Sequence, residues 1–262
     1  MALVDRSELS RAKRLVVKVG SSSISGDNEG KLELLVDALA KAHGRGAEVV
    51  LVSSGAIATG MPLLGLTKKP DDLATSQALA SVGQSRLISR YQQSLERFNV
   101  VAGQVLLTYG DLEAAETREN AKRAMDRLLS LRVLPIVNEN DTVATQEIRF
   151  GDNDRLAALV AVLLEADALI LLSDVDALYN KPPSNPDAKR IETVEFGDEL
   201  TGVEVSGSST GVGTGGAVTK VSAARIATEA GVSVLLTNTD NVAQALDGAL
   251  VGTWFKSKNS ER

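Results

Sequence analysis

The stretch Leu131-Arg132-Val133-Leu134-Pro135-Ile136-Val137-Asn138-Glu139-Asn140-Asp141 joins an apolar run to a cluster of short polar side chains. The apolar part, residues 131–137, predicts a buried parallel strand that ends at Asn138. Further on, Asp152-Asn153-Asp154 stands where a helix cap belongs, because apolar residues then recur at helical spacing from Leu156 to Leu163. The polar cluster is therefore expected between the carboxyl end of a strand and the amino end of a helix.

In open parallel sheets, ligands bind at such places, because strand ends and helix amino ends together leave unpaired N–H groups. Carboxylates and amides there suit a ligand with an ammonium group, and they also suit a metal-bound polyphosphate. The alternative is that Asp-rich loops of this kind are only caps and turns. This stretch alone leaves both interpretations open.

The rest of the chain repeats the alternation of strands and helices. Strands are expected at residues 15–19, 48–52, 100–107, 168–174 and 233–238. Helices are expected at 31–43, 75–97, 118–131 and 242–246, with a further one opening after Gly216. This order predicts right-handed crossovers and an α/β fold, a mostly parallel sheet covered by helices on both faces. We find no internal repeat and no Gly/Ser linker, and the charged segment 191–204 gives no clear pattern.

Composition narrows the function. The 262 residues are 44% hydrophobic, enough for one sizeable domain or two joined lobes. A net charge of −6 and a pI near 5.0 argue against nucleic-acid binding. There is no cysteine, and the single histidine, His43, ends a predicted helix, so we assign it no catalytic role. No apolar run reaches the length of a membrane span and no signal-peptide core follows the charged start, so a cytoplasmic protein is expected.

Lys18 lies inside the apolar run from Leu15 to Val19, which leads into the small residues Gly20 and Ser21. Lysine in such a run is often a protective charge on an edge strand. A first strand followed by a turn of small residues also brings backbone N–H groups close to phosphate, and a lysine there adds a positive charge. The second interpretation predicts a phosphate contact.

Ser54, Gly55 and Ala56 follow the second strand in the same way. Ser54 is either a helix cap or part of a site where Gly55 and Ala56 leave room for a ligand's carboxylate to reach backbone donors. In the long helix 75–97, Leu87, Ile88, Tyr91 and Leu95 share a face, which is typical of core or of a subunit contact.

A second glycine-rich stretch, residues 211–220, opens a helix and carries Lys220 one turn in. Gly211, Gly213 and Gly216 match G-x-G-x-x-G, but no strand precedes them, so a dinucleotide site lacks its required context. The P-loop pattern also fails, because Lys220 does not directly follow a glycine. A loop of N–H donors at a helix start, with a lysine beside it, is still suited to anionic oxygens.

Two lysines on glycine- or serine-rich turns, with acidic residues between them, indicate phosphoryl transfer, which needs no nucleophilic side chain. At this point the chain resembles the glutamate 5-kinases of the amino-acid kinase family, which phosphorylate the γ-carboxylate of L-glutamate with ATP as the first step of proline biosynthesis. The resemblance runs from about Arg14 to Phe255. It rests on five segments that stand as in that family: residues 16–21, 53–57, 137–141, 151–154 and 213–220.

The resemblance implies a three-layer α/β/α sandwich of the carbamate kinase type and a role for each motif. The catalytic residues would be Lys18 and Lys220, which would neutralise the transferring phosphoryl group from either side, and Asp154, which would hold the lysines in position. The glutamate-binding residues would be Ser54, Gly55, Ala56, Asp141, Asp152 and Asn153. The nucleotide-binding residues would be Lys18, Ser173, Asp174, Thr214, Gly215, Gly216, Ala217, Val218, Thr219 and Lys220. A lobe of about residues 12–165 would hold glutamate and a lobe of about 166–256 the nucleotide, within one kinase domain over 1–262. Mg²⁺ would accompany ATP, and its ligands are not assigned.

The resemblance also implies a homo-oligomer, dimer or tetramer, and functional coupling to glutamyl phosphate reductase, with no nucleic-acid or membrane partner. Many members of the family carry a second, C-terminal PUA domain, and the sequence ends after Phe255 without one, so regulation by proline is not carried over. Two alternatives stay open. One is a sister kinase for aspartate, N-acetylglutamate, carbamate or a nucleoside monophosphate, and the other is a non-catalytic amino-acid or nucleotide sensor.

Overall fold

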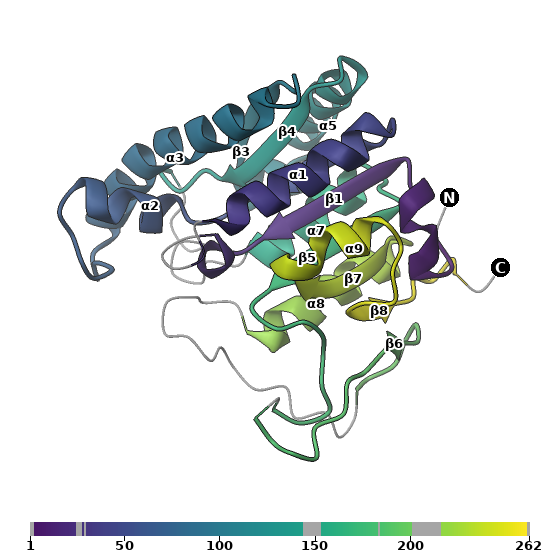
Figure 1. Ribbon diagram of the computed structural model, residues 1–262. Helices are drawn as coiled ribbons and strands as arrows, with labels where there is room; N and C mark the ends of the chain where they lie inside the picture. The colour runs from purple at the N-terminus through teal and green to yellow at the C-terminus, as the bar shows by residue number, and fades with distance from the viewer. Residues whose placement is uncertain are drawn as a thin grey trace.

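Strand β1 (Arg14–Val19) lies in the middle of an eight-stranded sheet with the order β3-β4-β2-β1-β5-β7-β8-β6 (Figure 1). The structure is a computed structural model and describes residues 3–24, 28, 30–143, 153–182, 184–200 and 216–260. The other strands are β2 (Glu48–Val52), β3 (Ala102–Leu107), β4 (Leu134–Glu139), β5 (Ala168–Ser173), β6 (Thr193–Val194), β7 (Ser233–Asn238) and β8 (Thr253–Phe255). Strands β1 to β5 and β7 run parallel, which confirms the predicted α/β class.

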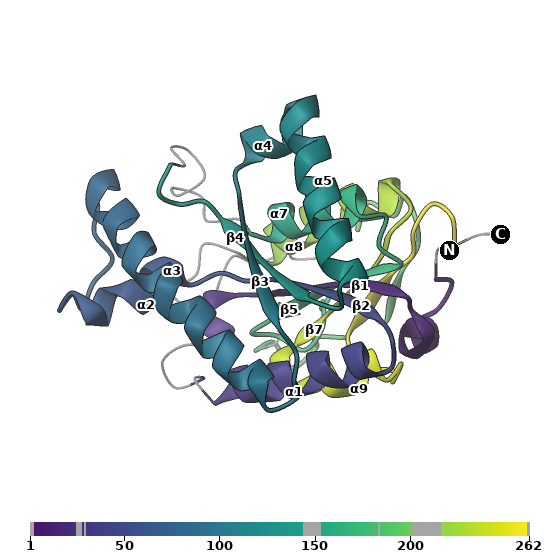
Figure 2. The same ribbon diagram turned by 90° about the horizontal axis from the view of Figure 1, so that it is seen from above.

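Helices cover both faces of this sheet (Figure 2). The α-helices are α1 (Lys31–Gly44), α2 (Ala56–Leu63), α3 (Leu73–Glu96), α4 (Tyr109–Glu113), α5 (Ala115–Ser130), α7 (Asn153–Leu163), α8 (Ala217–Glu229) and α9 (Val242–Leu246). Short 3₁₀ segments are η1 (Arg6–Arg11), η2 (Ser21–Ser23) and η4 (Thr239–Asn241). One core cluster joins the sheet to α1, α3 and α9, and the other joins it to α5, α7 and α8, so the architecture is a three-layer sandwich.

The side chains of β1 divide between these two cores. Leu15, Val17 and Val19 face the layer of α1 and α3, whereas Val16 faces the layer of α7 and α8. Because side chains alternate along a strand, Lys18 shares the face of Val16. The strand therefore directs Lys18 toward α7 and α8, and it lies between β2 and β5, so the edge-strand interpretation of this lysine is wrong.

The order of the strands also places a topological switch point at β1, the strand that carries Lys18. From β1 the chain proceeds to β2 on one side, and β5 later returns to pair with β1 on the other side. Such a switch point in a parallel sheet leaves a crevice beyond the carboxyl ends of the strands. The residues that follow β1, β2 and β5 are those that the sequence singled out.

Predicted element boundaries differ from the observed ones by a few residues. Both ends differ at β4, which begins at Leu134 rather than 131 and continues through Asn138 and Glu139. Helix α5 ends at Ser130, and its closing turn takes up residues 131–133, with Arg132 at a positive φ of 60°. Asn138 is consequently a buried strand residue, and the strand does not stop in front of it.

Helices α2 and α3 pack at unusually close range. A Cβ atom at Gly60 of α2 would collide with the carbonyl oxygen of Leu79, and one at Gly83 of α3 would collide with that of Ala56. Glycine at both positions lets the two backbones touch. This contact fixes α3 against the residues that follow β2, and it brings Gln84 to the end of the sheet.

At the other side of the sheet, β8 pairs with β7 in the antiparallel direction, and β6 pairs with β8. Of the segment 191–204, which gave no clear pattern, the described residues 191–200 contribute β6 and, at 194–200, line a cavity together with residues of α8. No helix of the described residues is long and apolar enough to cross a membrane.

Candidate active site

The lysines predicted to be catalytic meet at one carboxylate. Lys18 at the end of β1 places Nζ 2.5 Å from Oδ1 of Asp154, in the first turn of α7. Lys220, in the first turn of α8, places Nζ 3.1 Å from Oδ2 of the same carboxylate. Helices α7 and α8 pack against each other on the face of the sheet to which β1 directs Lys18. Three segments far apart in sequence thus form one charged cluster, which we call the lysine pair with Asp154.

This cluster is nearly closed to solvent. Asp154 is 1% exposed, Lys18 is 5% exposed and Lys220 is 6% exposed. Burial raises the pKa of the Asp154 carboxyl, but the two ammonium groups outweigh burial and lower it to about 2. Asp154 is therefore ionised at neutral pH. The three side chains together carry one excess positive charge, which suits an anionic ligand.

Thr219 adds a third contact to Asp154. Its hydroxyl lies 3.0 Å from Asp154 Oδ2 and 2.9 Å from the carbonyl oxygen of Gly216. Gly216 is the N-cap of α8, and among the described residues no side chain caps this helix. The N–H groups of its first turn, which includes Ala217 and the exposed Val218, are therefore oriented to receive anionic oxygens from a ligand.

The turn after β2 brings Ser54 next to β1. Ser54 Oγ donates to the carbonyl oxygen of Val19 at 3.1 Å, so its only hydrogen is engaged and it can offer a ligand only lone pairs. The N-cap of α2 is Gly55, which has a positive φ of 102°, so the interpretation of Ser54 as a helix cap is wrong. A side chain at Gly55 would also press on Ser21, and Ala56, buried, begins the helix.

Asn153, directly before Asp154, belongs to a network of buried amides. Its Nδ2 donates to the carbonyl oxygen of Ser53 at 2.6 Å and to Oδ1 of Asn138 at 2.9 Å. Asn138 in turn donates from Nδ2 to Oε1 of Gln84 at 2.7 Å. Ser53 Oγ and the hydroxyl of Tyr91, another α3 residue, lie 2.9 Å apart. The first residue of α7 and the residue that follows β2 are thus linked to α3.

Asp141 lies two residues past the end of β4 and is half-buried. Burial raises the pKa of its carboxyl to about 6, although the positive charge of Lys69 lowers it in part. Asp141 is therefore ionised above about pH 6, and in that state it is an acceptor for a cationic group. Its predicted role as the acceptor for a substrate's ammonium group stays a prediction.

The predicted nucleotide residues at the end of β5 lie at the same edge of the sheet. Ser173 is buried and donates to Oδ1 of the exposed Asp174 at 3.0 Å. Asp152, Thr214 and Gly215 lie outside the described residues. His43 contacts the carbonyl oxygen of Arg132, which precedes β4, so it lies at the amino-terminal edge of the sheet, away from the lysine pair.

Within the described ranges, no group of three or more His, Cys, Asp or Glu side chains could hold a metal ion. Both oxygens of Asp154 already contact ammonium groups or Thr219. These residues therefore do not fit a resident metal held by the protein alone. They do fit a ligand that carries its own cation, since Mg²⁺ usually takes most of its ligands from phosphates and water.

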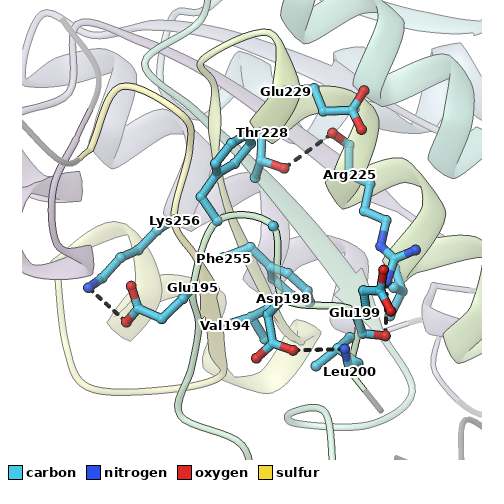
Figure 3. A pocket seen from close by; sticks show the side chains of 13 residues that line it. Val194, Glu195, Asp198, Glu199, Leu200, Arg225, Thr228, Glu229, Phe255 and Lys256 are labelled. Atoms are coloured by element: carbon cyan, nitrogen blue, oxygen red, sulfur yellow. Dashed lines mark hydrogen bonds and ion pairs between the residues drawn. The ribbon is translucent and has the colours of Figure 1, made fainter.

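A cavity of about 200 Å³ lies between the segment 194–200 and α8, and Figure 3 shows its lining. None of the residues that the sequence predicted as catalytic, glutamate-binding or nucleotide-binding lines this cavity. Both of its cationic side chains have protein partners: Lys256 pairs with Glu195 at 2.9 Å, and Arg225 donates to the carbonyl oxygen of Glu199 at 3.1 Å. We do not assign the active site to this cavity.

Sequence reasoning missed Gln84, Tyr91 and the amide role of Asn138 in the site. One signal was available, because Gln84 continues the apolar face of α3 that includes Leu87 and Tyr91, and a polar residue on a buried face needs a partner. That face packs inside the chain, since Leu87, Tyr91 and Leu95 are all buried. It is core, and the alternative of a subunit contact for it is wrong.

Comparison with known proteins agrees with this geometry. Residues 13–238 match the model of the amino acid kinase family. A glutamate 5-kinase of Clavibacter sepedonicus is 69% identical over 259 residues, covering 99% of this chain and 100% of the relative. A glutamate 5-kinase of Leifsonia xyli is 66% identical, covering 97% of this chain and 95% of the relative.

Relatives of greater length also match. A glutamate 5-kinase of Corynebacterium diphtheriae is 52% identical over 97% of this chain, which spans 68% of that relative. Among solved structures, a carbamate kinase from Giardia lamblia bound to AMP-PNP superposes with a TM-score of 0.67 at 17% identity, covering 95% of this chain, and this likeness supports the fold alone. The chain therefore belongs to the amino acid kinase family, and within it to the glutamate 5-kinases.

Proposed function

We propose that this chain transfers the γ-phosphoryl group of ATP to the γ-carboxylate of L-glutamate, which gives L-glutamyl 5-phosphate and ADP as the first step of proline biosynthesis. The observation that carries the proposal is the lysine pair with Asp154. It is a buried cluster with excess positive charge at the switch point of the sheet. The proposal is also supported by the glutamate 5-kinases that are 69% and 66% identical to this chain.

Lys18 and Lys220 neutralise the transferring phosphoryl group from two sides. Lys18 is on strand β1 and Lys220 is on helix α8. Because both elements are packed regular structure, the two ammonium groups would hold a phosphoryl group from fixed positions. Preorganised charge of this kind stabilises the charge that develops in the transition state. Asp154 holds both ammonium groups in position and keeps two like charges close together before the substrate arrives.

The reaction needs no general base. A carboxylate oxygen of glutamate attacks Pγ, and the bond between Pγ and the β,γ-bridging oxygen breaks, so ADP leaves with the electron pair. The γ-carboxyl group of glutamate, with an ordinary pKa of about 4.3, is already ionised at neutral pH. This explains how the site can work without cysteine and with its histidine at the opposite edge of the sheet.

Glutamate would bind beyond the ends of β1, β2 and β4. Asp141, Asn153 and the lone pairs of Ser54 offer acceptors for its ammonium group. The N–H groups near Gly55 and Ala56, at the start of α2, would receive a carboxylate. Asp152 is included by the resemblance of its motif.

The nucleotide would lie at the start of α8, where Gly216 to Lys220 supply N–H groups and positive charge for its phosphates. Ser173 and Asp174 border the same crevice, and Thr214 and Gly215 are included by resemblance. Mg²⁺ would enter with ATP and screen the charge of the phosphates, and its ligands would come mainly from phosphates and water. Residues of about 12–165 would thus serve glutamate and those of about 166–256 the nucleotide.

The remaining proposals concern assembly and location. A homo-oligomer, dimer or tetramer, is supported by two exposed apolar side chains at the end of the sheet, Leu106 in β3 and Val101 directly before it. A cytoplasmic location is proposed from the family resemblance. We propose coupling to a glutamyl phosphate reductase because the acyl phosphate product is reactive. Direct transfer to the reductase would limit its loss to water and other nucleophiles. Light scattering of the purified protein, alone and mixed with such a reductase, tests both proposals.

The test of the reaction is trapping of the product with hydroxylamine in the presence of ATP and Mg²⁺. L-Glutamate, L-aspartate and N-acetyl-L-glutamate are compared in parallel. We expect hydroxamate from L-glutamate alone. Hydroxamate from one of the other acids would favour a sister kinase, and tight ATP binding without any hydroxamate would favour a sensor.

A further inference from the structure

The buried amide network between α3 and α7 has a fixed direction. Gln84 is 9% exposed, Asn138 is 1% exposed and Asn153 is 5% exposed, so their amide groups depend on one another for hydrogen bonds. They come from α3, β4 and α7, and they connect residues 84, 138 and 153 in series. The last member precedes Asp154 of the catalytic cluster.

Two backbone groups, one at the middle amide Asn138 and one at Asn153, show which way each amide points. The N–H of Glu139 donates to Asn138 at 2.9 Å, and because an N–H can only donate, the atom that it meets is the acceptor Oδ1. Nδ2 of Asn138 therefore faces Gln84, which must present its acceptor Oε1. Asn153 must in turn donate to Asn138 Oδ1.

The carbonyl oxygen of Ser53 fixes the orientation of the Asn153 amide, at the end of the series. It can only accept, and it lies 2.6 Å from Asn153 Nδ2. Asn153 Nδ2 has two hydrogens, and both are directed to protein acceptors, Ser53 O and Asn138 Oδ1. A ligand can therefore receive from the Asn153 side chain only the carbonyl oxygen Oδ1, which accepts hydrogen bonds and does not donate them.

We propose that Gln84 is a positioning residue that sets substrate specificity: by accepting from Asn138, it acts together with the backbone groups of Glu139 and Ser53 to keep the Asn153 amide turned so that Oδ1 receives the ammonium group of the substrate. This inference rests on the proposed function, because it concerns the amino-acid substrate of that same site. Gln84 does not touch the substrate itself and acts through Asn138. An acid without the ammonium group gains nothing from this arrangement.

The chemistry at position 84 makes the role specific. An acceptor there satisfies the buried Nδ2 group of Asn138, whereas an apolar side chain leaves that donor without a partner and releases the amide to turn. Gln84→Met keeps the size of the side chain and removes the acceptor. Gln84→Glu keeps an acceptor oxygen whether the carboxyl is charged or protonated, so it should rescue the network.

The experiment measures the KM for L-glutamate and for ATP, and the inhibition constant of glutarate, which has the same two carboxylates without the ammonium group. For Gln84→Met we expect a glutamate KM about tenfold higher, the size of one lost hydrogen bond to a charged group, with the ATP KM and the glutarate constant within twofold. Gln84→Glu should stay within about threefold of the wild type in all three. Wild-type turnover of glutamate tests the proposed function separately, in the same assay.

Gln92→Met is the matched control. Gln92 is also on α3, and its Oε1 accepts from the backbone N–H of Ala102 at 2.8 Å, away from the amide network. This variant loses an acceptor of the same kind, so it reports the effect of a weakened α3 alone. Its glutamate KM should match that of the wild type.

A glutamate KM for Gln84→Met within twofold of the wild type would overturn the inference. So would a parallel rise in the glutarate constant, because it would mean general damage to the site, and so would a Gln84→Glu protein as impaired as Gln84→Met. If Gln84→Met does not accumulate as folded protein, Gln84→Asn takes its place, since its shorter side chain draws the acceptor back from Asn138. The same rise in glutamate KM is expected, and an unchanged value would again contradict the role of Gln84.

Discussion

Replacing Asp154 with asparagine removes the negative charge between Lys18 and Lys220 and keeps the shape of the side chain. The lowering of the Asp154 pKa from 3.8 to about 2 corresponds to roughly 2 kcal/mol of favourable interaction, at about 1.4 kcal/mol per unit. Loss of one member of a buried ion pair usually costs about 3–5 kcal/mol, because the remaining charges stay buried. We therefore expect Asp154→Asn to lower the free energy of unfolding by about 2–5 kcal/mol at pH 7.

The same substitution should reduce kcat by roughly 100-fold or more, since the two ammonium groups are no longer held where the phosphoryl group passes. The KM for ATP should stay the same or fall, because phosphate no longer competes with a carboxylate for the lysines. Urea unfolding followed by circular dichroism gives the stability, and ADP release at saturating glutamate gives kcat.

Asp247→Asn is the control for this prediction. Asp247 also bridges two cations, Lys41 at 2.6 Å and Arg45 at 2.7 Å, but its side chain is 42% exposed. Exposed pairs contribute at most about 1 kcal/mol, so this variant should remain active and nearly as stable as the wild type. An Asp154→Asn enzyme with kcat within tenfold of the wild type, or with the stability of Asp247→Asn, would refute the reasoning.

Four further outcomes follow from the structure. The Asp154 pKa is lower in the folded chain than the ordinary 3.8, so its contribution to stability is complete above about pH 4 and is lost as the pH falls toward 2, which acid unfolding of the wild type and of Asp154→Asn compares. Lys220→Ala should lower kcat by roughly 100-fold, and near-normal turnover in the folded variant would reject its role. Because burial raises the pKa of Asp141 to about 6, kcat/KM for glutamate should fall as the pH drops through 6. Asp141→Asn should raise the glutamate KM about tenfold or more and abolish this fall in kcat/KM. An unchanged dependence of kcat/KM on pH in the variant would exclude Asp141 from the ammonium site. Gly83→Ala should lower the unfolding free energy by about 1–3 kcal/mol, because its Cβ meets the carbonyl oxygen of Ala56, whereas Gly44→Ala, with open space around it, should not.

Much of the fold could be predicted because its strands are short apolar runs with clear ends. Strands β2 and β7 occupy the predicted residues, as does α9. Helix α3 starts at Leu73, two residues earlier than predicted, because Asp72 caps it by accepting from the N–H of Thr75. The antiparallel direction of β8 could not be read from three residues, since a strand this short carries no signal of its orientation.

The position of Lys18 shows where sequence reasoning stops. Residues 15–17 and 19 of β1 are all apolar, so no alternation around Lys18 reveals which face of the sheet a given side chain takes. The choice depends on which helices cover each face, and that follows only from the complete topology. The residues alone marked Lys18, Lys220 and Asp154 as polar positions, and the family resemblance implied that Asp154 holds the two lysines. The structure adds the contacts themselves and the packing of α7 on α8 that produces them.

Gln84 marks a second limit. It lies far from Asn138 in sequence, and their contact depends on the close crossing of α2 and α3 at Gly60 and Gly83. A polar residue on an apolar helical face indicates that a buried partner exists, but it does not identify that partner. The direction of the amides then depends on individual backbone groups, which only the structure supplies.

The most direct test of the central claim uses L-glutamate labelled with ¹⁸O in its γ-carboxylate. The enzyme is supplied with ATP, Mg²⁺ and hydroxylamine, and the released phosphate is followed by ³¹P NMR. If a γ-carboxylate oxygen attacks Pγ, that oxygen becomes the bridge of the acyl phosphate and leaves with phosphate when hydroxylamine takes the acyl group. We expect one ¹⁸O atom in each phosphate formed with hydroxamate, and unlabelled phosphate would contradict attack by the γ-carboxylate.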